Sequence, residues 1–273
     1  MTDIAHAPIG VFDSGVGGLT VAREIMRQLP DERIIYFGDT ARVPYGSKSK
    51  ETIIRFSRQI VRFLKSKGVK ALVVACNTAS ALALEEIQAQ EELPMIGVLK
   101  PGAKVAAEAT KNGKIGVIAT ESTIASQLYT KVIRHHCPHA QVFGKACPLF
   151  VPLVEEGWMK DPVTVEVANR YLEPLKESGI DTLILGCTHY PLLRSTIGQI
   201  MGDSVTLVNP AYETARELKE LLAANSLLND GKCIPPGDMH QFYVSDAAEK
   251  FKKFANSILP YGIDNTKLIH IEE

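Results

Sequence analysis

The chain has 273 residues, of which 45% are hydrophobic and 22% charged, and its formal net charge is −1. This length is enough for one large domain or two smaller ones with a buried core. The near-zero net charge gives no reason to expect nucleic acid or an anionic membrane as the main partner. No apolar run reaches the roughly 20 residues that a membrane-spanning helix needs.

The N-terminal segment and the cysteines predict a cytoplasmic protein. The first ten residues lack the basic start and apolar core of a signal peptide. The five cysteines are an odd number and are scattered along the chain. This pattern is typical of free thiols in a reducing compartment rather than of a disulfide framework.

Short apolar runs alternate with longer amphipathic stretches. Apolar residues recur at helical spacing over 22–29 and 53–64, and Gly68 follows where the second of these helices would end. This alternation predicts an α/β fold with mostly parallel sheets, because parallel strands buried on both faces are apolar throughout. The expected strands are 9–12, 34–37, 71–75, 95–98, 115–119, 182–185 and 205–208.

Two pairs of segments indicate an internal duplication. Residues 9–14 resemble 115–120, and residues 73–78 resemble 184–189, in the same order and at similar separation. Two pseudo-symmetric α/β domains facing a central cleft would explain this. Ligands of parallel sheets bind at the carboxyl ends of the strands, so the cysteines that end the second pair would lie on opposite sides of one crevice.

Two loops are candidates for binding a small carboxylate. The glycine-rich segment 13–20 follows an expected strand and precedes a helix, so its backbone N–H groups could approach an anion. Its G-x-G-G spacing lacks the third glycine of a dinucleotide fingerprint. The segment 38–46 could present Tyr45 and backbone amides in the same way. The alternatives are a tight turn capped by Asp13 and an ordinary ordered loop.

Two cysteine motifs carry the most specific signal. Cys-Asn-Thr begins at Cys76 and Cys-Thr-His begins at Cys187, and each directly follows an expected strand. A thiol near a helix N-terminus is expected to have a lowered pKa and to serve as a base. His189 could tune the second thiol or donate a proton. The alternative is a pair of buried small hydrophobic residues, which the matching polar neighbours make less attractive.

The other candidate groups give weaker signals. Cys137, Cys147 and Cys233 have no such partner and are interpreted as structural. Glu155 and Glu156 follow an apolar stretch. They belong either to a solvated helix face or to a site in which a carboxylate orients a substrate ammonium or His189.

Taken together, the segments 9–21, 38–46, 75–79 and 185–193 closely resemble the glutamate racemases of the aspartate/glutamate racemase superfamily. The resemblance runs from residue 9 to 193 and, less distinctly, to the end. It implies a first domain of residues 1–99 and 210–273 and a second of residues 100–209. It also implies a homodimer that needs no cofactor, metal, nucleic acid or membrane. Lys100 and residues 119–122 depart from the family pattern.

The resemblance also assigns roles to single residues. Cys76 and Cys187 are the acid/base pair, with Cys76 acting on the D-enantiomer and Cys187 on the L-enantiomer. Glu155 matches a family glutamate, and in the mechanism that follows, Asp13 and His189 are the best candidates to assist the thiols. The residues implied to contact the substrate are Asp13, Ser14, Tyr45, Gly46, Asn77, Thr78, Thr188 and His189.

The expected function is interconversion of L- and D-glutamate, which would supply D-glutamate for peptidoglycan synthesis. A racemase of the same superfamily acting on aspartate or a hydantoin is the nearest alternative. A non-catalytic amino-acid-binding protein or a two-cysteine redox sensor is an alternative of another class. A sensor needs thiols that can meet in a disulfide, with Cα atoms within about 7 Å.

Overall fold

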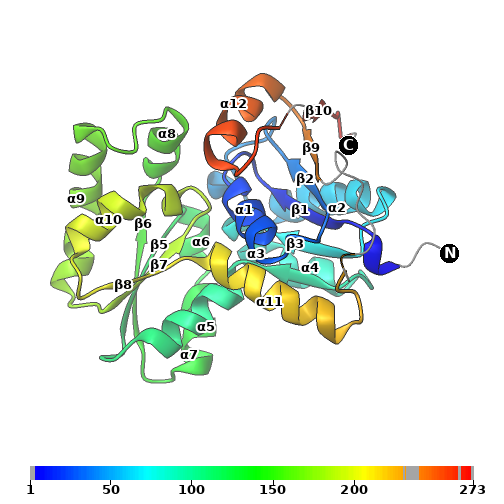
Figure 1. Cartoon of the computed structure of the whole chain (residues 1–273). Helices are drawn as coiled ribbons and strands as arrows, with labels where there is room; N and C mark the ends of the chain where they lie inside the picture. The colour runs from blue at the N-terminus through cyan, green and yellow to red at the C-terminus, as the bar shows by residue number, and fades with distance from the viewer. Residues whose placement is uncertain (1–3, 230, 232–239, 264–265, 272–273) are drawn as a thin grey trace.

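The chain folds into two parallel sheets, each covered by helices on both faces (Figure 1). The computed structural model describes residues 4–229, 231, 240–263 and 266–271. Cys233 lies outside these residues. Two sheets with interleaved helices confirm the predicted α/β class and its two facing parts. None of the helices in the described ranges is long and apolar enough to cross a membrane.

The first sheet has six strands in the order β10-β9-β2-β1-β3-β4. Its helices form one layer of α1, α11 and α12 and a second layer of α2, α3 and α4. The strands are β1 (Ile9–Asp13), β2 (Ile34–Gly38), β3 (Ala71–Val74), β4 (Met95–Gly97), β9 (His240–Val244) and β10 (Thr266–Leu268). The helices are α1 (Leu19–Gln28), α2 (Lys50–Ser66), α3 (Asn77–Leu82), α4 (Leu84–Gln88), α11 (Pro210–Ala224) and α12 (Ala248–Ile258), with 3₁₀ turns η1 (Ile4–His6) and η2 (Tyr45–Ser47).

The second sheet has four strands in the order β6-β5-β7-β8. Helices α8, α9 and α10 cover one face, and α5 and α7 cover the other. The strands are β5 (Lys114–Ala119), β6 (Gln141–Ala146), β7 (Thr182–Gly186) and β8 (Thr206–Val208). The remaining elements are α5 (Leu99–Ala109), α6 (Glu121–Ala125), α7 (Leu128–His136), α8 (Phe150–Glu155), α9 (Pro162–Glu177), α10 (Arg194–Met201) and the 3₁₀ turn η3 (Tyr190–Leu193).

The two sheets repeat one topology. Strands β1 to β4 are ordered 2-1-3-4, and strands β5 to β8 are ordered 6-5-7-8, all with parallel pairing. β1 therefore corresponds to β5, and β3 to β7, as the two repeated sequence segments indicate. β9 and β10 extend the first sheet beyond β2. The chain crossings near 99–100 and 209–210, which bound the two domains, stay a prediction.

The structure contains three strands that the apolar pattern does not predict: β6, β9 and β10. β6 lies at the edge of its sheet, and all of its residues are either exposed or half-buried. It therefore lacks the continuous apolar run of a strand covered on both faces. Helices α1 and α2 cover the two stretches in which apolar residues recur at helical spacing. Gly68 follows α2 with a φ of +71°, a left-handed conformation that glycine adopts without strain.

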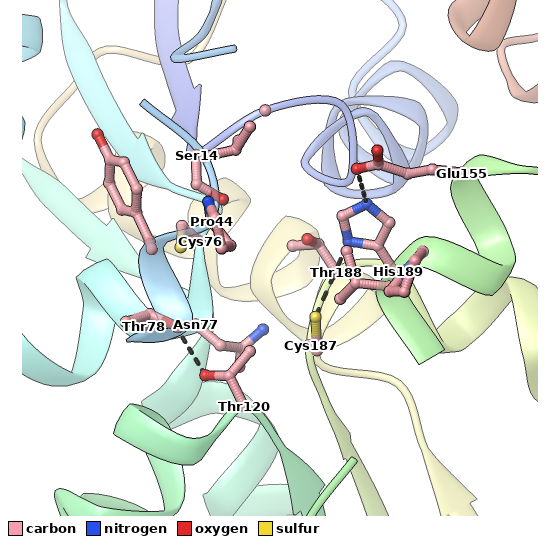
Figure 2. Close-up of a pocket in the computed structure, with 16 residues that line it drawn as sticks. Ser14, Pro44, Cys76, Asn77, Thr78, Thr120, Glu155, Cys187, Thr188 and His189 are labelled. Carbon is pink, nitrogen blue, oxygen red and sulfur yellow. Dashed lines mark hydrogen bonds and ion pairs between the residues drawn. The ribbon is translucent and has the colours of Figure 1, made fainter. Parts of the chain in front are cut away.

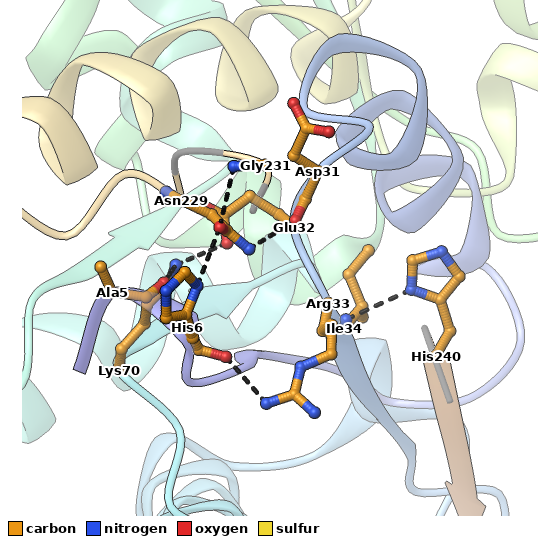
Figure 3. Close-up of polar contacts among 10 residues, drawn as sticks. All are labelled: Ala5, His6, Asp31, Glu32, Arg33, Ile34, Lys70, Asn229, Gly231 and His240. Atoms are coloured by element: carbon orange, nitrogen blue, oxygen red, sulfur yellow. Dashed lines mark hydrogen bonds and ion pairs between the residues drawn. The ribbon is translucent and has the colours of Figure 1, made fainter. Parts of the chain in front are cut away.

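A buried ion pair ties together the amino ends of the strands in the first sheet. The Lys70 Nζ lies 2.5 Å from Glu32 Oε2, and the two side chains are 0% and 2% exposed. The same Nζ donates to the Ala5 carbonyl, and Glu32 Oε1 accepts from the Asn229 backbone N–H at 2.9 Å (Figure 3). This cluster joins the N-terminal turn, the β1–β2 connection and the segment after α11.

Lys70→Met is expected to lower the free energy of unfolding by about 3–5 kcal/mol, because it leaves the Glu32 carboxylate buried without its cation. The measurement is a urea unfolding curve. The matched control is Lys65→Met, which removes the exposed Lys65–Glu91 pair and should cost less than about 1 kcal/mol. Equal unfolding midpoints for the two variants would contradict the assignment.

Candidate active site

A cavity of about 250 Å³ lies where the carboxyl ends of the two sheets face each other. Figure 2 shows Cys76 beside Ser14 and Pro44, and Cys187 beside His189 across the cavity. Every residue with a predicted site role except Asp13 lines this cavity: Ser14, Tyr45, Gly46, Cys76, Asn77, Thr78, Glu155, Cys187, Thr188 and His189. The structure therefore gathers residues from both sheets around a single cavity.

Asp13 ends β1 directly behind the cavity wall and is 0% exposed. Its Oδ2 accepts a hydrogen bond from the Gly15 backbone N–H at 2.9 Å, while Oδ1 has no hydrogen-bond partner. Burial raises the pKa of this carboxyl, and His189 and the backbone donors only partly oppose the shift. Asp13 is thus a buried carboxyl that binds a proton more readily than an exposed one.

Cys76 follows β3 and caps α3, with its sulfur accepting from the Ala79 backbone N–H at 3.5 Å. The expectation of a lowered pKa at this helix terminus is wrong. Burial, followed by the negative charge of Asp13, raises the pKa of the Cys76 thiol to about 12. The hydrogen bonds from Ala79 and Ser14 lower it by less. Without a ligand, Cys76 is therefore a neutral thiol at physiological pH.

Cys187 belongs to a chain of three polar groups. Its sulfur lies 3.9 Å from His189 Nδ1, and His189 Nε2 lies 3.2 Å from Glu155 Oε1 (Figure 2). Burial alone would lower the pKa of His189, but the hydrogen bonds to Cys187 and Glu155 outweigh it and raise the pKa to about 10. The hydrogen bond to His189 in turn lowers the pKa of Glu155. The Cys187 side therefore favours an imidazolium held between the Cys187 sulfur and the Glu155 carboxylate.

Hydrogen bonds between residues that follow the strands join the two sheets next to the cavity. After β3 and β5, Thr78 Oγ1 lies 2.9 Å from Thr120 Oγ1. After β1 and β7, the Thr20 hydroxyl donates to the Thr188 carbonyl at 3.0 Å. Gly17 permits the second contact, since a Cβ there would lie 2.3 Å from Thr188 Oγ1 and 2.6 Å from the His189 ring. The glycine-rich segment therefore allows close approach of the second sheet as well as lining the pocket at Ser14 and Gly15.

The loop of Tyr45 and Gly46 is anchored from behind by a buried carboxylate. The Tyr45 hydroxyl donates to Asp39, which is 0% exposed. Asp39 also accepts from Arg42 at 2.7 Å and from Ser245 at 2.9 Å. The phenol hydroxyl thus points away from the cavity, and the ring and the backbone of this loop form the wall.

Neutral donors dominate the wall. The Tyr129 hydroxyl donates to Asn77 Oδ1 at 2.7 Å, which turns the Asn77 amide nitrogen toward the cavity (Figure 2). No lysine or arginine is among the described residues that line the cavity. A ligand carboxylate would therefore bind to hydroxyls and N–H groups. In the part of the chain that the structure describes, no cluster of His, Cys, Asp and Glu could hold a metal ion.

Sequence reasoning missed several residues of the site. Thr120 lines the cavity although its segment departs from the expected pattern, and Val151 and Pro152 add apolar wall. Lys250 of α12 lies 3.5 Å from Glu155 Oε2. Thr120 could have been found, because it is the counterpart of Ser14 in the repeated segment. Nothing in the local sequence marks Lys250, which approaches Glu155 only through the tertiary fold.

Comparison with known proteins gives consistent matches. The Asp/Glu/Hydantoin racemase family model matches residues 9–218. A glutamate racemase from Geobacter metallireducens is 51% identical, over 97% of each chain. The crystal structure of the glutamate racemase isoform RacE1 from Bacillus anthracis has a TM-score of 0.93 and 43% identity, over 98% of each chain. A glutamate racemase from Francisella tularensis, solved with D-glutamate, has a TM-score of 0.90 and 38% identity, over 98% of this chain and 99% of that one.

The raised pKa of Cys76 predicts slow alkylation. In a Cys187→Ala variant at pH 8, iodoacetamide should modify Cys76 roughly a thousand times more slowly than a small thiol with a pKa of about 8.5, because only the thiolate reacts. The rate should rise about tenfold per pH unit up to pH 10. Mass spectrometry of the modified peptide measures it. A rate that levels off below pH 9 would show that the pKa is not raised.

Proposed function

The chain belongs to the Asp/Glu/Hydantoin racemase family, and from that premise we propose that it interconverts L- and D-glutamate by cofactor-independent proton transfer between two thiols. Racemisation requires removal of the α-proton from one face and delivery of a proton to the other. The observation that carries the proposal is the presence of Cys76 and Cys187, from equivalent strands of the two sheets, in the wall of one cavity.

On the first side of the site, Cys76 exchanges protons with the α-carbon of D-glutamate, with Asp13 behind it. A thiol with a pKa of about 12 is a proton donor in the resting site. Its thiolate becomes accessible when the substrate ammonium brings a positive charge into the cavity. Asp13 supports this step because its pKa is raised toward that of the thiol and its Oδ1 has no hydrogen-bond partner. In the proposed mechanism Asp13 accepts the proton of Cys76 and returns it.

On the second side, Cys187 exchanges protons with the α-carbon of L-glutamate. The His189 imidazolium, which is stabilised by Glu155, would stabilise a Cys187 thiolate at 3.9 Å and can give that thiolate a proton. Asp13 and His189 carry opposite charges, so each favours the ionised form of the other. This balance lowers the cost of holding ionised groups in a closed cavity.

The remaining wall binds the two carboxylates and the developing carbanion. The backbone of Ser14 and Gly46 and the polar groups of Asn77, Thr78 and Thr188 are donors at the cavity surface. Fixed donors in a site that excludes water can stabilise negative charge as it develops next to the α-carbon. The proposed reaction requires this stabilisation because the α-proton is far less acidic than a thiol and no cofactor accepts the electron pair.

The proposed biological role follows from the family. D-Glutamate made in the cytoplasm would feed bacterial peptidoglycan synthesis, and the enzyme would act as a homodimer on its small-molecule substrate alone.

In the direct test, purified, pyridoxal-free protein is incubated with L-glutamate in the presence of a thiol reductant, and the circular dichroism of the glutamate is measured over time. The signal should decay to zero, and L-aspartate at the same concentration should remain unchanged. Decay with aspartate instead would favour the aspartate branch of the family. No decay with either substrate, in folded and reduced protein, would leave the binding or redox-sensor alternatives.

Replacement of either thiol should abolish turnover and leave the fold intact. Cys76→Ala and Cys187→Ala are each expected to lose at least about a thousandfold in kcat/KM, because each removes one of the two proton carriers. The matched control is Cys137→Ala, whose half-exposed thiol does not line the cavity and whose loss should leave kcat/KM unchanged. Near-normal turnover in either active-site variant would overturn the two-thiol mechanism.

A further inference from the structure

Helix α12 belongs to the helical layer of the first sheet but contacts the second half of the site. Phe251 and Ala255 are buried in the core beneath the first sheet. Lys250 and Phe254, one helical turn apart, extend toward the second sheet instead. Phe254 packs against the cores of both sheets, and its ring centroid is 6.5 Å from that of His189. One helix face thus spans the two parts of the molecule.

The segment that leads into this helix is hydrogen-bonded to the loop that forms the Tyr45 side of the cavity. Ser245, directly after β9, donates to Asp39 Oδ1 at 2.9 Å and accepts from the Ala41 backbone N–H at 2.9 Å. Asp39 in turn holds the Tyr45 hydroxyl. The segment from Ser245 to Phe254 therefore contacts Asp39 on the Tyr45 side of the cavity and the His189–Glu155 pair on the Cys187 side.

Lys250 interacts with the carboxylate that supports His189. Its Nζ lies 3.5 Å from Glu155 Oε2, while Oε1 of the same carboxylate lies 3.2 Å from His189 Nε2. Glu155 is at the end of α8, and its side chain is 26% exposed. A carboxylate in that position can rotate into water, and a cation that binds one oxygen restricts this rotation and leaves the other oxygen facing the imidazole.

We propose that Lys250 is a positioning residue for racemisation, which orients Glu155 toward His189 and so supports proton transfer at Cys187 but not at Cys76. The inference rests on the proposed function and deepens it. The site is then chemically asymmetric, with a cross-domain ion pair supporting one thiol and the buried Asp13 supporting the other. Lys250 and Glu155 lie on helices that cover different sheets, so their contact also joins the two sides of the cavity.

The test compares Lys250→Met, Lys250→Arg and the matched control Lys253→Met, an exposed lysine on the same helix. Partly exposed ion pairs contribute up to about 1 kcal/mol, or about fivefold in a rate, so Lys250→Met should lower kcat roughly two- to fivefold with little change in KM. Lys250→Arg should restore most of the rate, and Lys253→Met should match the wild type. A Lys250→Met variant that behaves like the control overturns the proposal.

A double-mutant cycle with Glu155→Gln separates positioning from a general structural effect. If Lys250 acts through Glu155, removing it in the Glu155→Gln background should change kcat by less than about 1.5-fold. Equal factors in the two backgrounds would contradict a route through Glu155.

A readout without turnover keeps this proposal separate from the proposed function. Iodoacetamide should modify Cys187 two- to fivefold more slowly in Lys250→Met than in the wild type, while the rate at Cys76 stays the same. Absence of racemase activity in the wild type would reject the proposed function. Equal rates of Cys187 modification in the wild type and Lys250→Met would reject the role of Lys250.

Discussion

The site depends on a pair of reciprocal contacts between the carboxyl edges of two sheets that share one topology. Thr78 after β3 meets Thr120 after β5, and Thr20 after β1 meets Thr188 after β7. Since β1 corresponds to β5 and β3 to β7, the two contacts join corresponding pairs of strands, although they use different residues and atoms. Cys76 and Cys187, which follow the corresponding strands β3 and β7, lie in the wall of the cavity between these edges.

This near-symmetric scaffold carries two chemically different supports for its thiols. Cys76 has the buried carboxyl of Asp13 behind it and a raised pKa. Cys187 has the His189–Glu155 pair, to which α12 adds Lys250. The proposed reaction at the α-carbon needs only that both thiols reach it, so the residues that control the proton affinity of each thiol can differ. The close approach of the halves does constrain the sequence, because Gly17 has no room for a Cβ.

The sequence predicts the strands that are buried on both faces and the residues that belong to the two repeated segments. Strands such as β1 and β7 are apolar throughout because helices cover both faces, and the repeated segments reveal the two cysteines. The edge strand β6 is half exposed and leaves no such pattern. The pKa of Cys76 could not be predicted from its place at a helix terminus, because the depth of burial and the charge of Asp13 are tertiary effects. Lys250 approaches Glu155 from far along the chain.

The central claim, that one thiol removes the α-proton and another delivers a proton to the opposite face, is tested most directly by the location of deuterium at low conversion. L-Glutamate is incubated with the protein in D₂O, and the reaction is stopped after a few per cent of conversion. The two-thiol account predicts D-glutamate that carries deuterium at the α-carbon, with the remaining L-glutamate still protonated. A D-glutamate product that retains the original hydrogen, or equal deuterium in both enantiomers, would show that a single base serves both faces and would contradict the account.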